Sequence, residues 1–182
     1  MPTTDLTTQK LLSALIDFCT TYATPALADD MHVLAGFGNR ITLPADGNDI
    51  CIVTPISQTR SGTTIERYER DGPDTQELRE YVDLDVQIDC YSTNLFDARQ
   101  RAATLETVAR SSVGVAHFLK YDIDCLYSDT VQNLSAVIDS GQYVSRWMLL
   151  LHLGYWKRVE VAQDFFSAVD VRLKNVDVHF KP

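Results

Sequence analysis

The chain has 182 residues, of which 45% are hydrophobic, so it can form one globular domain over residues 1–182 and is not a disordered chain. Its formal net charge is −9 at pH 7. An acidic surface repels phosphate, which excludes a protein that grips DNA but not one that DNA slides past. No apolar run reaches the roughly 18 residues that cross a bilayer, and no basic-then-apolar leader is present, so we expect no membrane contact and a cytoplasmic protein.

The first part of the chain predicts one helix, one short strand and a loop. Residues 6–22 place apolar side chains at helical spacing, and Pro25 marks where the chain leaves that helix. Residues 31–34 are a candidate strand. Residues 36–49 hold glycines, a proline and several Asn and Asp residues, which is typical of a loop with turns.

The next segments predict a long β-hairpin. Residues 50–56 are apolar on both faces, as in an interior strand, and Pro55 indicates an edge or a bulge at its far end. Residues 63–69 alternate weakly, and residues 71–74 are typical of a turn. We therefore expect an extended β-hairpin arm over about residues 57–82, with too little apolar surface to be stable without a partner. Its candidate assembly residues are Arg60, Arg67 and Tyr68.

The stretch from Tyr81 to Tyr91 alternates without a break between apolar even positions and mostly polar odd positions. This period of two predicts a β-strand with one buried and one polar face. A slip of one residue would bury three aspartates, so the register is tightly set. The polar face carries Asp83, Asp85 and Asp89, which we call the aspartate row.

The second half of the chain predicts two helices and two strands. Residues 95–111 form a helix with a stripe of small apolar side chains, and Arg101 lies largely outside that stripe. A shorter helical piece covers residues 113–119. Residues 143–156 are apolar on both faces, so this strand is central or is covered on its second side by another subunit. Residues 169–180 alternate with a change of parity, as in a bulged strand or two short strands.

These elements predict an α+β fold. Its sheet is mixed and mainly antiparallel, two main helices pack on that sheet, and the extended β-hairpin arm projects from it.

Three interpretations of the aspartate row stay open. It can be a solvated polar face, an acidic wall toward passing DNA, or a site for Mg²⁺ or Ca²⁺, which prefer carboxylate ligands. Alternate residues on a strand lie about 6.5 Å apart, and the strand holds no lysine or other base. Replacing the three aspartates with Asn separates an enzyme, which would lose turnover, from a protein that would still assemble.

Other reactive side chains carry no recognised motif. The four cysteines lack CxxC spacing and lie in apolar surroundings, which is typical of reduced, buried thiols. The four histidines form no HxxxH or HExxH pair, and His152 lies in an apolar strand like a satisfied core residue. Tyr143, Trp147 and Tyr155 are typical of a core rather than of a base-stacking surface. We expect no catalytic residue, no cofactor and no metal.

Six segments follow one another along the chain: Gly38-Asn39-Arg40 with Leu43-Pro44, residues 50–58 (ICIVTPISQ), residues 86–91 (VQIDCY), the alanine-rich helix from Asp97, Gln142-Tyr143 with Arg146-Trp147, and Asp164-Phe165-Phe166. In this order they resemble a family of bacteriophage neck proteins, the tail terminators or head–tail joining proteins. The resemblance covers roughly residues 30–166.

The resemblance implies a structural virion protein and not an enzyme. Members of the family form a homohexameric ring that caps the tail tube and joins it to the head-side connector, and DNA passes through the ring without specific binding. The implied partners are other copies of the chain, the tail tube and tail sheath proteins, and the head-side neck proteins. The implied location is the virion, with the host cytoplasm during assembly. In such a ring the aspartate row is the candidate lumen-facing surface.

Two alternatives accompany this interpretation. The chain can form another neck ring, an adaptor or a stopper, or it can be a metal-dependent enzyme that uses the aspartate row.

Overall fold

The computed structural model describes residues 8–36, 49–68, 75–137 and 143–162. Most of the loop expected at 36–49, the turn at 71–74 and the strand expected at 169–180 lie outside the described residues. The helices are α1 (Thr8–Tyr22), α2 (Leu95–Ala109) and α3 (Ser112–Leu119), with a short 3-10 turn η1 (Asp30–His32) before the first strand. The helices predicted from the sequence are thus confirmed, with ends shifted by a few residues.

The sheet follows the order β1-β2-β3-β7-β4, and β5 and β6 also pair with β7. Only the β1–β2 pair is parallel among the described strands. The strands are β1 (Val33–Ala35), β2 (Ile50–Tyr68), β3 (Thr75–Ser92), β4 (Asp124–Ser128), β5 (Gln132–Asn133), β6 (Ala136–Val137) and β7 (Tyr143–Ala162). The mixed, mainly antiparallel sheet with packed helices confirms the predicted α+β fold.

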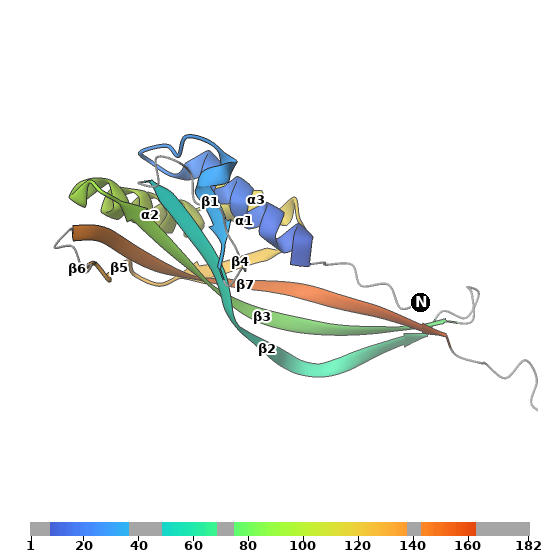
Figure 1. Ribbon diagram of the computed structural model, residues 1–182. Coiled ribbons are helices and arrows are strands. Elements are labelled where there is room, and N and C mark those ends of the chain that lie inside the picture. The colour runs from blue at the N-terminus through green and yellow to red at the C-terminus, as the bar shows by residue number, and fades with distance from the viewer. Residues whose placement is uncertain (1–7, 37–48, 69–74, 138–142, 163–182) are drawn as a thin grey trace, which may run out of the picture.

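The core lies between the three helices and one face of the sheet (Figure 1). The even positions of β3 from Leu84 to Cys90 and the odd positions of β7 from Leu149 to Leu153 are buried on this face, as the alternation predicted. They meet Leu15 and Phe18 of α1 and Leu105 of α2, among others. Each fully buried aliphatic side chain contributes roughly 1.5–3 kcal/mol to folding.

Away from the helices, three strands continue as an arm (Figure 1). In it β3 pairs with β2 as far as Tyr68 and with β7 as far as Ala162. The arm is therefore three-stranded rather than the two-stranded hairpin expected from the sequence, because β7 runs six residues past the expected end at Trp156. The bulge expected near Pro55 is confirmed, and a second one follows Ser61.

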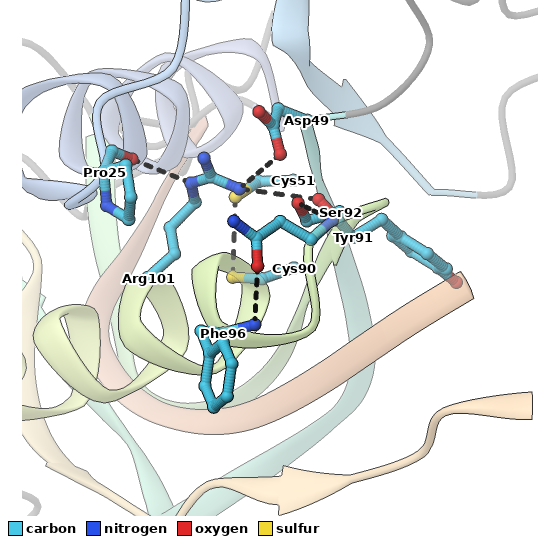
Figure 2. A network of polar contacts seen from close by, with 9 residues as sticks. Pro25, Asp49, Cys51, Cys90, Tyr91, Ser92, Phe96 and Arg101 are labelled. Carbon is cyan, nitrogen blue, oxygen red and sulfur yellow. Dashed lines mark hydrogen bonds and ion pairs between the residues drawn. The ribbon is translucent and has the colours of Figure 1, made fainter. Parts of the chain in front are cut away.

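Helix α2 is fixed to the sheet end by Arg101, whose side chain is fully buried. Its guanidinium donates to the Pro25 carbonyl (2.9 Å), to the Asp49 carboxylate (3.3 Å) and to the Tyr91 carbonyl (3.4 Å) (Figure 2). The expectation that Arg101 lies largely outside the buried stripe is wrong. The guanidinium instead joins the segment after α1, the start of β2 and the end of β3.

The same region holds a cluster of thiols. All four cysteines are buried and free of disulfides, as the sequence predicted. Cys51 and Cys90 lie opposite each other on β2 and β3 with their sulfur atoms 3.5 Å apart. The hydrogen bond that the Cys90 thiol makes with Cys51, followed by burial, raises the pKa of Cys90 well above its usual value, so this thiol stays protonated at neutral pH.

Candidate functional site on the outer sheet face and the arm

The sheet has a second face, opposite the three helices, which we call the outer face. It carries the odd positions of β3 from Glu77 to Tyr91 and the even positions of β7 that oppose them, from Arg146 to Glu160. No described helix covers this face (Figure 1). The three members of the aspartate row occupy odd positions of β3 and therefore lie on this face.

The aspartate row does lie on one face, as predicted, and each member has partners on a neighbouring strand. Asp83 accepts a hydrogen bond from the Ser61 hydroxyl. Asp85 accepts one from the Ser57 hydroxyl (2.5 Å) and lies 2.6 Å from Nδ1 of His152. The Ser57 hydrogen bond, followed by the contact with His152, holds the pKa of the Asp85 carboxyl below its usual value.

Asp89 differs from the other two aspartates because it is buried, with only 4% of its surface exposed. It forms a two-pronged ion pair with Arg146 of β7, with donor–acceptor distances of 3.0 and 3.1 Å. Gln87 donates a further hydrogen bond of 2.6 Å. The negative charge of Asp89 is therefore compensated within the sheet. A two-pronged ion pair between a guanidinium and a carboxylate is strong and directional.

His152 lies beside the aspartate row rather than in the core. Its ring stacks on Tyr127 of β4 at 4.0 Å between ring centres, and Nε2 lies 3.5 Å from a carboxylate oxygen of Asp129. The imidazole is thus placed between two carboxylates, those of Asp85 and Asp129. Within the described ranges, no three histidine, cysteine or carboxylate side chains gather closely enough to hold a metal ion.

The arm joins the body at Tyr81. Its ring crosses β7 at Gly154 and donates a hydrogen bond of 2.9 Å from its hydroxyl to Asp124 on β4. A Cβ at position 154 would lie 2.0 Å from that hydroxyl oxygen, so only glycine leaves room for the crossing. Trp156 packs edge-on against the same ring at 5.2 Å. Burial, followed by the Asp124 hydrogen bond, raises the pKa of Tyr81 to about 12.

Beyond Tyr81, the outer face of the arm contains a pocket of about 390 Å³. Three strands contribute to its walls, which are formed by Ile65, Glu66, Arg67, Arg79, Trp156 and Arg158. Glu77 lies beside it, 2.8 Å from Arg79 and 3.9 Å from Arg158. The hydrogen bond from Arg79, with the charges of Arg158 and Arg67, holds the pKa of the Glu77 carboxyl below its usual value.

The three arm residues singled out from the sequence do not form one site. Arg67 lines the pocket, whereas Arg60 is 3.8 Å from Glu80 on the opposite face of the arm. Tyr68 ends β2, opposite Gln76. Sequence reasoning missed Arg79, Trp156 and Arg158 as pocket residues. The signal that could have found Arg158 is its spacing of two residues from Trp156, which puts both on one face if the strand continues.

A family model described as phage neck terminator protein matches residues 9–177, nearly the whole chain. Comparison with curated proteins found no match. In the described part of the chain, no helix has the length and apolar character to cross a membrane. The chain belongs to the phage neck terminator protein family and is a structural protein of the phage neck, and thus of the virion.

Proposed function

We propose that the chain is a tail terminator, which closes into a homohexameric ring, caps the tail tube and connects it to the head-side neck proteins. The observation that carries this proposal is the arm. Three strands extend beyond the helix-covered body, where neither face has a described helix against it (Figure 1). A ribbon of this kind leaves apolar side chains exposed, and contact with a partner would bury them.

The arm presents apolar side chains that ordinary folding would bury. Ile65 is 51% exposed, Trp156 44% and Val161 40%. In the described residues, β2 beyond Val53 and β7 beyond Gly154 pair on one side only, each with β3. Exposed strand edges and apolar side chains together favour contact with another chain. In a ring each arm contacts the next copy, which is a head-to-tail interface that closes on itself.

The aspartate row supports passage of DNA if the outer face near the body turns toward the lumen. Carboxylates repeated around a ring repel phosphate and keep the duplex mobile. Among the described residues, Asp83 and Asp85 contact two neutral serines and a histidine and supply most of this charge, whereas the ion pair with Arg146 neutralises Asp89. The function rests on shape and polarity and not on bond-making.

Growth of the tail tube in vitro tests the proposal. Purified tube protein is polymerised with and without the chain, and tube lengths are measured by electron microscopy. A terminator stops growth at far fewer copies of the chain than of tube protein, because one ring blocks one end. An adaptor or stopper ring binds head-side neck proteins but leaves tube lengths unchanged, and that result would reject the tail-terminator assignment.

A further inference from the structure

The arm has two strand edges that no described strand covers, one on each side of the ribbon (Figure 1). Among the described residues, 56–68 of β2 and 155–162 of β7 pair only with β3, which lies between them. The two edges reach the same level along the arm, because Arg67 and Glu160 both lie opposite Glu77. Backbone N–H and C=O groups therefore point outward along both margins of one ribbon.

The direction of the two edges suits them to pair with each other in neighbouring copies. Both β2 and β7 run antiparallel to β3, so they are parallel to each other. Copies in a ring are related by rotation about its axis, which keeps the direction and the level of every strand. The β7 edge of one copy therefore meets the β2 edge of the next as a parallel neighbour. Neither residues 56–68 nor residues 155–162 contain a proline, which would remove a backbone donor.

The β2 edge offers two regular segments for pairing. Its register with β3 shifts after Pro55 and again after Ser61, which leaves regular pairing at 57–61 and 65–68. The β3–β7 register has no shift. Every side chain from 56 to 67 is exposed, so no other described element covers either face of this part of β2. A second strand can therefore approach both segments.

The size of a closed sheet agrees with a ring of six copies. Six arms of three strands each would close into a barrel of about 18 strands. With strands about 4.8 Å apart and tilted by about 40°, the circumference is about 110 Å and the diameter about 35 Å. Side chains take roughly 5 Å at each wall, so a channel about 25 Å wide remains for DNA. Three copies would give about nine strands, and side chains fill a barrel of that size.

We propose that β7 of each copy pairs in parallel with β2 of the next copy, so that the arms form one closed β-barrel around the lumen of the ring. The inference rests on the proposed ring and names the contact that joins its members. Closure gives both edges of every arm a partner, and only a closed barrel leaves a sheet without edges. The competing occupants of the β7 edge are residues 163–182 of the same copy and a strand of the tail tube protein.

Disulfide cross-linking between strands tests the pairing. Within one copy β2 and β7 lie two strands apart, about 10 Å, with β3 between them. A disulfide needs Cα atoms within about 7 Å, so a bond between these strands joins two copies. Glu160→Cys is combined in turn with one of three substitutions on the same face of β2, because strand tilt sets the register: Ser61→Cys, Ile65→Cys and Arg67→Cys. Rings assembled on tail tubes are oxidised with copper phenanthroline and examined on non-reducing gels.

The matched control is Glu77→Cys with Glu160→Cys, because these two positions oppose each other within one copy. The proposal predicts a ladder of two to six linked chains for at least one β2 position, and single chains for the control. The unmodified protein, whose four cysteines are buried, should give no links.

Two results would overturn the pairing. One is complete rings that give no ladder at any of the three β2 positions, as expected if another segment covers the β7 edge. The other is linked pairs from Glu160→Cys alone, which would mean that β7 pairs with β7. Absence of rings in the unmodified protein would instead reject the proposed function, so the two failures are distinguishable.

A lysine added to the edge gives a second measurement. Lysine on an edge strand disfavours pairing with another strand, so Val161→Lys should raise the concentration for half-maximal ring formation at least about tenfold. Val115→Lys on α3 adds the same charge at a side chain of similar exposure, 38% against 40%, and should change that concentration less than about threefold. Folding of each variant is checked by circular dichroism. Equal effects of the two substitutions in folded protein would contradict the pairing.

Discussion

Asp89 gives the sharpest test of which carboxylates in the aspartate row are structural. Asp89→Asn keeps the shape of the side chain but removes the charge that pairs with Arg146. Removing one member of a buried ion pair costs about 3–5 kcal/mol. The Arg146 side chain is 34% exposed and can regain water, so we expect a loss of about 2–3 kcal/mol. Asp83 accepts its hydrogen bond from a neutral serine hydroxyl, so Asp83→Asn should cost less than about 1 kcal/mol.

Urea unfolding at a fixed protein concentration measures both losses, followed by circular dichroism and extrapolated to water. A double-mutant cycle with Arg146→Met should give a coupling energy of about 1–3 kcal/mol for the pair. If Asp89→Asn and Asp83→Asn cost the same within about 0.5 kcal/mol, or if the coupling is zero, the pair does not form in solution. Asp89 would then be as free as Asp83 to act on passing DNA.

Three further predictions concern single positions. Gly154→Ala should displace Tyr81, break its 2.9 Å hydrogen bond to Asp124 and cost about 1–3 kcal/mol of stability. It should also lower the pKa of Tyr81 from about 12, as measured by ultraviolet titration with Tyr81→Phe as the reference. An unchanged titration would contradict the crossing of Tyr81 over Gly154. Arg101→Met should cost about 2–4 kcal/mol in urea unfolding, because the partly buried carbonyls of Pro25 and Tyr91 and the Asp49 carboxylate lose a donor. A cost below about 1 kcal/mol would reject the anchor. The pKa of the Asp85 carboxyl is lowered from its ordinary 3.8, so the ionised carboxylate stabilises the folded protein above that pH, and this stabilisation is lost as the pH falls below it. The difference in unfolding free energy between the unmodified protein and Asp85→Asn should therefore shrink on acidification. A constant difference would refute the shift.

The helices and the long strands of the body could be predicted because each buries one side, whereas the short strands β4, β5 and β6 were not predicted as separate elements. Strand β3 alternates strictly from Tyr81 to Tyr91 since the helices cover its even positions. In the arm no described helix covers either face, so β7 beyond Trp156 has polar and apolar side chains on both faces. Its pattern therefore does not show where the strand ends. That is why the third strand of the arm was missed.

The candidate site could be predicted only in part. Alternation places the aspartate row on one face, but the partners Ser57, Arg146 and His152 lie on other strands, and the order of strands is not encoded in any local pattern. Arg101 was misplaced because its charge suggested solvent. Its spacing from Ala98 and Leu105, three and four residues away on the same helix, matches the buried stripe.

Cryo-electron microscopy of tail tubes mixed with the purified chain tests the central claim most directly. The account predicts one ring at one end of each tube, with six copies and with each arm lying against the adjacent copy. Tube ends without a ring, or a ring whose arms contact no other copy of the chain, would contradict it.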